Sequence, residues 1–389
     1  MTILHKGFDT LAIAIQANIP LDFFEYLEVE KERADKERHD VLTEFNGVKL
    51  HLKSHGGKGY RFIANGGPDG AHWFFKKPNA KDKWGIRVSF GSYFLAHYGL
   101  AAARLHLEQV LGQLGVRFGE EDVSISRVDF CIDVLAPDFK LIPERFVMHS
   151  STGRRDFIEE MTKVVHGKSG RTTSVTIGST RNRQVIIYDK RAEIIHTGKA
   201  YWWGIWNHTL RGLGLPLLAP DNPEISRVWR VEFRAGKDLL KDRWGIRTWT
   251  QLHDLFGDLC CEAGEVVRYT DPNPNDPNRA RWPNHLLWEL VCAEMNDELC
   301  EMRSGCDPNP MKEVHKENHI SMMIRQIRGN IITLAALNGK SQEELPKFLQ
   351  ETANDLSHEV IQNPEKTRKQ LQSAKDRYVF IQPKKHAHG

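Results

Sequence analysis

Three short segments of the chain divide into two faces when every second residue is assigned to the same side. They are "SISRVDFCIDV" (124–134), "QVIIYDK" (184–190) and "RVWRVEFR" (227–234). A period of two is typical of β-strands, and a slip of one residue would exchange the two faces. The pattern therefore predicts three strands of one sheet, each with an apolar face for a core.

The other face of these strands carries side chains that are typical of catalytic and binding sites. Its members are Arg127, Asp129 and Asp133 in the first segment, Tyr188 and Lys190 in the second, and Arg230, Glu232 and Arg234 in the third. Asp189 falls on the opposite face from Tyr188. If the three polar faces coincide, three carboxylates converge near one tyrosine.

Such a cluster predicts a metal-assisted reaction at phosphorus. Carboxylates that are held together repel one another unless a cation neutralises them. An oxygen-rich site suits Mg²⁺ or Mn²⁺, so Asp129, Asp133 and Glu232 are the predicted metal ligands. A cation beside a tyrosine favours the phenolate, which is the form that attacks phosphorus. Tyr188 is the predicted nucleophile, and Lys190 or Arg230 would stabilise the charge.

A structural interpretation of the same residues stays open. The carboxylates could instead pair with arginines two positions away on their own strands. The candidate pairs are Arg127 with Asp129, Arg230 with Glu232, and Arg234 with Glu232. Ion pairs of this kind are common on sheet faces, and a tyrosine in a strand is usually a packing residue. Only the coincidence of the three strands favours the catalytic interpretation.

The rest of the chain predicts an α+β fold, with a largely antiparallel sheet and helices packed on one face. Residues 7–40 have helical character, period-two segments follow from residue 48, and "YTDPNPNDPNRARWPN" (269–284) cannot sustain a helix. We expect an N-terminal helical segment (1–45), a main domain (46–268), a linker (269–284) and a smaller helical C-terminal domain (285–380).

Charge and cysteine content restrict the class of protein. The net charge is only +3, but residues 163–199 hold eight Lys and Arg against two acidic residues, which is typical of phosphate binding. The six cysteines show no metal-binding spacing and are expected to be reduced thiols. No apolar run is long enough to span a bilayer. We expect a cytoplasmic protein without a membrane partner.

The motif series resembles that of the replication initiation factor family of the Rep-trans type. This family comprises the rolling-circle replication initiators and related relaxases of plasmids, conjugative elements and phages. Its pattern R-x-D-x-x-x-D falls on Arg127, Asp129 and Asp133, and its R-x-E falls on Arg230 and Glu232. Between them, "IGS" at 177–179 leads into the Y-D-K-x-x-E that begins at Tyr188 and ends at Glu193. The likeness covers roughly residues 48–260.

The resemblance implies a DNA nicking and joining domain of the Rep type, with an acidic metal site in place of the paired histidines of the HUH group. Such an enzyme uses Mg²⁺ or Mn²⁺, nicks one strand of an origin through a tyrosine, and stays linked to the 5′-phosphate. The freed 3′-hydroxyl then primes replication. Tyr201 is the reserve nucleophile. The expected partner is partly single-stranded DNA, and a host helicase and a second copy of the chain are further candidates.

Several residues near the motifs are expected to bind DNA. The candidates are Arg127, Gly178, Ser179, Arg181, Arg183 and Arg234. Trp202, Trp203 and Trp206 would either stack on unpaired bases or pack in a core.

Two other functions remain open from the sequence. A conjugative relaxase would use the same chemistry, and a non-catalytic DNA-binding regulator would keep the carboxylates as structural groups. Metal-dependent nicking separates the last from the other two.

Overall fold

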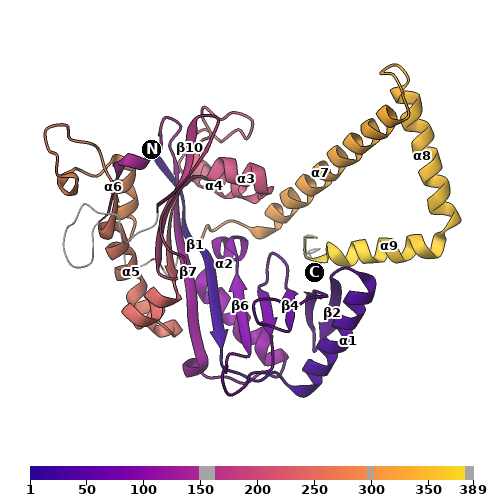
Figure 1. Cartoon of the computed structure of the whole chain (residues 1–389), viewed down its shortest axis with the longest axis horizontal. Helices are drawn as coiled ribbons and strands as arrows, with labels where there is room; N and C mark the ends of the chain where they lie inside the picture. Colours follow the sequence, from indigo (N-terminus) through magenta and orange to yellow (C-terminus); the bar gives the residue numbers. More distant parts are fainter. Residues whose placement is uncertain (149–162, 296–298, 300–301, 382–389) are drawn as a thin grey trace.

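The computed structural model describes residues 1–148, 163–295, 299 and 302–381. Its centre is an 11-stranded antiparallel sheet with the order β2-β3-β4-β5-β6-β1-β7-β12-β11-β10-β9 (Figure 1). The bounds of these strands are β1 Thr2–Ile15, β2 Val41–Phe45, β3 Val48–Leu52, β4 Phe62–Asn65, β5 His72–Phe75, β6 Ile86–Phe90, β7 Val123–Leu135, β9 Lys163–Lys168, β10 Arg171–Gly178, β11 Arg183–Asp189 and β12 Val228–Gly236. A separate pair joins β8 (Phe146–Met148) to β13 (Val267–Tyr269). The predicted antiparallel sheet is confirmed.

The three strands predicted from their alternation are β7, β12 and β11, and they are neighbours in the sheet. Asp133 lies opposite Arg230, and Arg230 lies opposite Tyr188. Residues in register across neighbouring strands present their side chains to the same face. The predicted polar faces therefore coincide.

The expectation of helix over residues 7–40 is wrong for the first part of that range. β1 is a 14-residue strand between β6 and β7, and only Leu21–Glu37 (α1) is helical. Three irregularities in the β1–β7 register break the alternation. They shift the apolar residues out of a period of two, so the strand shows a pattern closer to that of a helix.

Helices cover both faces of the central strands. On the apolar face, α5 (Trp249–Val266) and α6 (Leu286–Ala293) pack through Phe256 against Phe8 and through Trp288 against Phe233. On the polar face lie α3 (Lys190–Thr197) and α4 (Tyr201–Gly212). In the N-terminal half, α2 (Ser92–Gln113) packs against β1 and β6. α6 follows residues 269–284 in the chain and packs in the main hydrophobic core. The main core therefore includes residues on both sides of this segment.

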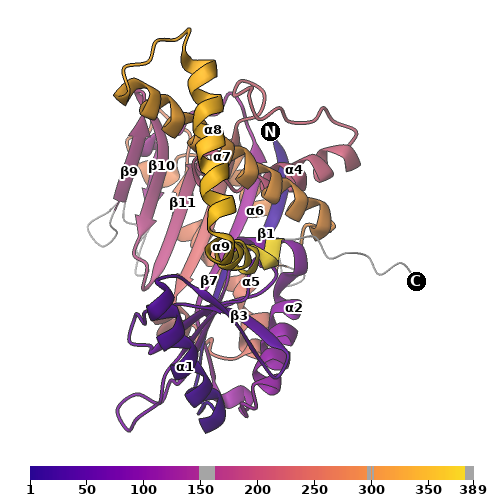
Figure 2. The ribbon, with the colours of Figure 1, turned by 90° about the vertical axis from the view of Figure 1, so that its right-hand side faces the viewer.

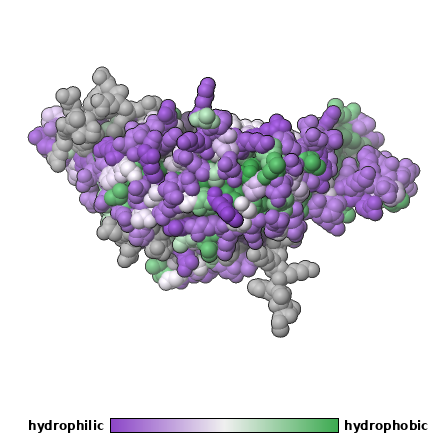
Figure 3. Space-filling model, turned by 90° about the horizontal axis from the view of Figure 1, so that it is seen from below, coloured by the Kyte–Doolittle hydropathy of each residue, from purple (hydrophilic) through white to green (hydrophobic). Residues whose placement is uncertain are grey.

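The C-terminal helices form an arm that leaves the body and returns to it (Figures 1 and 2). They are α7 (Pro308–Leu337), α8 (Leu345–Gln362) and α9 (Pro364–Arg377). The arm ends beside the N-terminal half, where the rings of Phe380 and His51 lie 4.9 Å apart. Seen from below, the arm extends to the right and carries apolar residues among hydrophilic ones (Figure 3). The predicted helical C-terminal region is confirmed. None of the described helices is long and apolar enough to cross a membrane.

Candidate active site

An ion pair between Arg230 and Asp133 forms the buried floor of the polar face. Arg230 donates through Nε to Asp133 Oδ1 at 2.5 Å and through Nη2 to Oδ2 at 2.8 Å, and both side chains are fully buried. The indole of Trp206 also donates to Asp133 Oδ2, at 2.8 Å. Burial alone would raise the pKa of Asp133, but the charge of Arg230 holds it below its ordinary value. Asp133 is therefore a structural anion whose oxygens are already hydrogen-bonded.

Arg230 itself is held from three sides. Besides Asp133, its guanidinium binds the carboxylate of Asp9 on β1. The ring of Trp202 on α4 lies 4.2 Å from the guanidinium carbon, which is the geometry of a cation–π contact. This side chain thus joins β12 to β7, β1 and α4, and it has no exposed surface with which to meet DNA.

A second acidic pair, Asp129 and Glu232, lies along the same face. Arg234 Nε is 2.6 Å from Glu232 Oε1 and 3.6 Å from Asp129 Oδ2, so the two carboxylates share one cation. Arg127 Nε donates to Asp129 at 2.9 and 3.0 Å. Two of the three same-strand pairs that the structural interpretation predicted are therefore present, whereas Arg230 pairs with Asp133 and Asp9 and not with Glu232.

These two carboxylates are nevertheless less fully neutralised than Asp133. Burial and then the charge of Glu232 raise the pKa of Asp129 to about 7, against the opposing effect of Arg127. Glu232 Oε2 is buried and has no hydrogen-bond partner among the described residues. A buried carboxylate oxygen without a partner costs free energy, so this pair is the place on the face where a cation or a proton would be most stabilising.

The three predicted metal ligands do not form one set in this structure. Within the described residues, no group of three or more His, Cys, Asp or Glu side chains is placed to hold an ion. Asp133 is occupied by Arg230 and Trp206, and Asp129 by Arg127, so of these three carboxylates only Glu232 has an oxygen without a hydrogen-bond partner among the described residues. Two carboxylates can hold a divalent cation only if water or a phosphate supplies further ligands.

Tyr188 lies half-buried beside this pair, near the end of β11 and just before α3. Lys190 Nζ is 3.5 Å from its hydroxyl oxygen and 5.6 Å from the centre of its ring. Burial, followed by the negative charge of Glu232, raises the pKa of Tyr188 well above its ordinary value. The phenol is therefore protonated in this state, and a reaction at its oxygen would need a group that accepts the proton.

Two acidic residues that the sequence reasoning gave no role lie around the same tyrosine. The charges of Asp9 and Glu193 also raise the pKa of Tyr188. Glu193 binds Lys190 Nζ at 2.7 Å and Lys199 Nζ at 3.1 Å, which fixes the lysine beside the phenol. Glu193 ends the Y-D-K-x-x-E motif and could have been found there. Asp9 was hidden because its strand was interpreted as helix.

Asp189 has a separate, local role, as the alternation of faces predicted. It is the N-cap of α3, where its side chain accepts the amide of Ala192 at 2.9 Å. It also pairs with Arg171 at 2.8 Å, on the side of the strand away from Tyr188. This cap ends β11 and starts the helix whose first residue is Lys190.

Tyr201 and two of the three tryptophans lie inside the protein. The Tyr201 hydroxyl shares a hydrogen bond of 2.8 Å with Ser92 Oγ, and the side chain is 4% exposed. Trp202 and Trp206 are fully buried, so the core interpretation holds for both. Trp203 alone among them is half-buried. Tyr188 is thus more exposed than Tyr201.

The residues expected to bind phosphate are mostly structural. Gly178 adopts φ +96°, and a Cβ there would lie 2.0 Å from the carbonyl oxygen of Arg183, so the β10–β11 turn requires glycine. The Ser179 amide donates to the same carbonyl at 3.0 Å. Arg183 is on the apolar face, where it pairs with Glu262 at 3.2 Å. Arg181 is exposed and pairs with Asp238 at 3.2 Å. At this turn, Ser179 and Arg181 are both exposed, whereas Arg183 is buried.

The protonation of His5 tests how completely water is excluded from the buried part of the site. Burial lowers the pKa of His5 to about 4. The unfolded chain would bind a proton here near pH 6.5, so between pH 6.5 and 4 the unfolded state holds more protons and the native state loses stability as the pH falls. The loss is up to about 3 kcal/mol. We expect His5→Gln to lose less stability over this range than wild type, as measured by urea unfolding at stepwise pH. Parallel profiles would show that His5 is solvated.

Comparison with known proteins finds similarity among solved structures. No family model matches the chain, and no curated protein is significantly similar to it. Among solved structures, the chain is similar to the rolling circle replication initiator protein from Geobacillus stearothermophilus. The two chains are 14% identical with a TM-score of 0.41, over 77% of this chain and 98% of that one. At this level of similarity the role of each residue has to be argued from the chain itself.

Proposed function

We propose that this chain is a DNA nicking and strand-transfer enzyme that starts rolling-circle replication, with Tyr188 as its nucleophile. The observation that carries the proposal is the surroundings of the Tyr188 hydroxyl. It is half-buried on the sheet face, 3.5 Å from an ammonium group and beside a buried carboxylate, Glu232, that has an oxygen without a partner among the described residues. A nucleophile, a base and a positive charge in one place are the parts of a phosphoryl-transfer site.

The proposed step exchanges one ester bond for another. Tyr188 Oη forms a bond to phosphorus, the bond from phosphorus to the 3′-oxygen breaks, and the 5′-phosphate stays on the tyrosine. Glu232 accepts the phenolic proton, and the departing 3′-oxygen takes a proton from water to become the hydroxyl that primes synthesis. Lys190 stabilises the phenolate, while Glu193 keeps its ammonium in position. Arg230 acts from below by fixing Asp133 and Asp9.

The residues present fit a divalent cation at the second acidic pair. Asp129 and Glu232 would hold Mg²⁺ or Mn²⁺, because a cation there would neutralise the two neighbouring carboxylates and favour the ionised form of Asp129. When bound, such an ion would polarise the phosphodiester and stabilise the charge that develops on it. Asp133 is not part of this proposed set.

The proposed partner is DNA that is single-stranded at the cut. Residues 163–168 (β9) are exposed and include Lys163 and Lys168, and Arg181 is exposed at the neighbouring turn. Only β10 separates β9 from β11, and Arg181 lies in the turn between β10 and β11, so these cations would bind phosphates near β11. We also propose two protein partners. A host helicase would unwind the duplex, and a second copy of the chain would supply another tyrosine for rejoining.

The test is to map the covalent peptide. Wild-type protein is incubated with Mn²⁺ and a pool of single-stranded oligonucleotides of random sequence, and protein–DNA adducts are isolated under denaturing conditions. We expect one adduct whose DNA is attached through its 5′-phosphate to the peptide that contains Tyr188. No adduct under any metal condition would overturn the enzymatic function, and an adduct on another residue would overturn the assignment of the nucleophile.

Glu232→Gln should separate catalysis from folding. The substitution keeps the shape and a hydrogen-bonding oxygen for Arg234 but removes the proposed base, so we expect adduct formation to slow by about 10²- to 10⁴-fold. The free energy of unfolding should change little, because hydrogen bonds compensate the buried negative charge of Glu232 only in part. Single-turnover kinetics and urea unfolding measure the two effects. A variant that reacts at the wild-type rate would exclude Glu232 as base and as metal ligand.

A non-catalytic DNA-binding regulator is the second candidate function. It is favoured by the arginine partners of the carboxylates, since Arg127, Arg230 and Arg234 all form ion pairs on this face. The same peptide-mapping experiment decides between the two, because a regulator binds DNA without forming an adduct. A conjugative relaxase shares the proposed chemistry and differs in the DNA that it cuts.

A further inference from the structure

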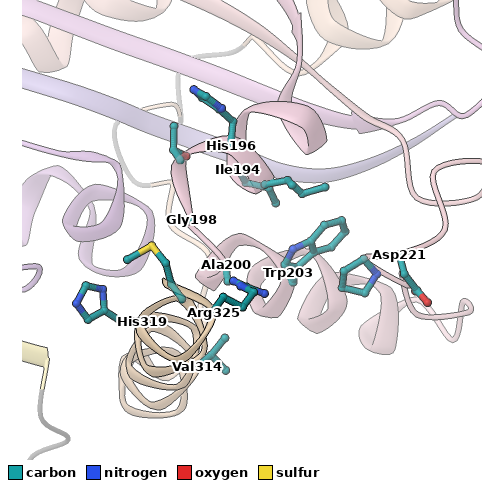
Figure 4. A pocket seen from close by; sticks show the side chains of 13 residues that line it. Ile194, His196, Gly198, Ala200, Trp203, Asp221, Val314, His319 and Arg325 are labelled. Atoms are coloured by element: carbon teal, nitrogen blue, oxygen red, sulfur yellow. The ribbon is translucent and has the colours of Figure 1, made fainter. Parts of the chain in front are cut away.

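A pocket of about 700 Å³ lies between α3, α4 and the first half of α7, outside the acidic face (Figure 4). This volume is in the range of small-molecule binding sites. Figure 4 shows Arg325 reaching from α7 toward Trp203 on α4, with Asp221 of the following loop beyond the indole. An aromatic ring, a cation and a hydrogen-bond acceptor thus line one hollow.

Trp203 is held in a fixed orientation at the pocket. Its ring meets the fully buried Trp206 edge to face, with centroids 5.3 Å apart and planes at 88°. Trp206 is itself fixed by its hydrogen bond to Asp133. A half-buried indole that is supported in this way can stack on a flat ligand with little loss of side-chain entropy.

The opposite wall carries positive charge without a partner. Arg325 has no hydrogen bond or ion pair among the described residues and is exposed, and it lines the pocket with His196 and His319. His319 is oriented by a hydrogen bond of 2.9 Å between its Nε2 and the hydroxyl of Tyr378, which ties α7 to the end of the arm. An unpaired arginine beside an aromatic ring suits a nucleotide, whose base stacks and whose phosphate is anionic.

The pocket is also connected to Tyr188 by one short helix. α3 begins at Lys190, beside the phenol, and its last residues, 194–197, line the pocket. Eight helical residues span about 10 Å. A strand that keeps the axial rise of duplex DNA, about 3.4 Å per nucleotide, covers this distance in about three nucleotides.

We propose that this pocket holds an unpaired base of the DNA strand that Tyr188 cuts, about three nucleotides from the scissile phosphate. The base stacks on Trp203, a neighbouring phosphate binds Arg325, and Asp221 accepts a hydrogen bond from the base edge. This inference rests on the proposed function, since it takes single-stranded DNA as the substrate. It also gives α7 a role, because the C-terminal arm supplies one wall of the DNA site.

The test uses photochemical crosslinking in a Tyr188→Phe background, in which the DNA is not cut. The probe is a fluorescein-labelled oligothymidylate of about 20 nucleotides that carries 5-iododeoxyuridine, long enough to cover a single-strand binding site. We expect crosslinks to the peptide that contains Trp203. In the same background, Trp203→Ala should weaken binding about 5- to 150-fold by fluorescence anisotropy, which corresponds to the loss of one stacked base. Trp203→Phe should restore most of the affinity.

Matched controls make the result specific. Trp84 is a half-buried tryptophan on the loop between β5 and β6, and Trp84→Ala should leave the affinity unchanged. Thermal unfolding confirms that each variant is folded. Crosslinks that map only outside α3, α4 and α7, or a folded Trp203→Ala protein with parental affinity, would overturn the inference. If wild type forms the Tyr188 adduct while Trp203 has no effect on binding, the pocket assignment alone fails. If binding depends on Trp203 but no adduct forms, the pocket assignment stands and the proposed chemistry fails.

Discussion

Tyr188→Phe should form no covalent DNA adduct and should leave supercoiled DNA uncut, a loss of at least about 10⁴-fold if the hydroxyl is the nucleophile. The phenylalanine keeps the ring, and the only hydrogen bond lost among the described residues is the long one from Lys190 at 3.5 Å. The free energy of unfolding should therefore stay within about 1 kcal/mol of wild type. DNA binding should also persist, since the ring and the charges around it remain. Gel detection of radiolabelled adducts together with urea unfolding tests both statements.

Tyr201→Phe is the matched control for this prediction. It removes a hydroxyl from a buried tyrosine that hydrogen-bonds Ser92, so it should cost about 1 kcal/mol of stability and leave the adduct intact. Tyr188→Phe should therefore abolish the adduct with little loss of stability, whereas Tyr201→Phe should lower the stability and leave the adduct intact. An adduct that survives Tyr188→Phe but not Tyr201→Phe would mean that the buried tyrosine becomes exposed during the reaction and that our assignment is wrong.

The faces of the central strands could be predicted from the sequence because burial on one side enforces a strict alternation. In β7 the apolar residues at 128, 130, 132 and 134 all belong to the core, and the three polar strands came into register as expected. The assignment of Tyr188 to the face opposite Asp189 rests on the same rule and is also correct. One bulge within these segments would have moved half of the site to the other side.

The pairing of the charges could not be predicted in the same way. Same-strand pairs such as Arg234 with Glu232 follow from spacing, and they were a stated alternative. The bond between Arg230 and Asp133 depends on which strands are neighbours, and its partner Asp9 lies on a strand whose bulges concealed it. A carboxylate that looks like a metal ligand in the sequence is thus a structural anion once its arginine is known.

The aromatic run after α3 shows a similar limit. "YWWGIW" predicts both a core and a base-stacking surface, and helical periodicity alone does not say which residue takes which part. In the structure, contacts with Arg230 and Asp133 bury Trp202 and Trp206, and Trp203 is left at the pocket. The division is set by the position of α4 against the charged floor, which is a tertiary property.

That charged floor leads to the second large effect, on stability. Arg230→Ala should lower the free energy of unfolding by about 3–5 kcal/mol, because it leaves Asp133 buried without its cation and removes the partner of Asp9. Arg230→Lys should recover little, since an ammonium cannot donate to both oxygens of Asp133 and reach Asp9 as the guanidinium does. Urea unfolding measures these changes. Arg181→Ala, which breaks an exposed pair with Asp238, should cost less than about 1 kcal/mol in the same assay.

A second substitution identifies the cause of that loss. If the cost of Arg230→Ala is the charge left on Asp133, then adding Asp133→Asn should return part of the stability, although each substitution alone destabilises the protein. The asparagine side chain would keep an oxygen for the Trp206 indole and carry no charge to desolvate. Additive losses in the double variant would mean instead that Arg230 acts by packing against Trp202. In either case the effect on nicking should follow the folded fraction, because Arg230 is fully buried and supports Tyr188 only through the groups that it binds.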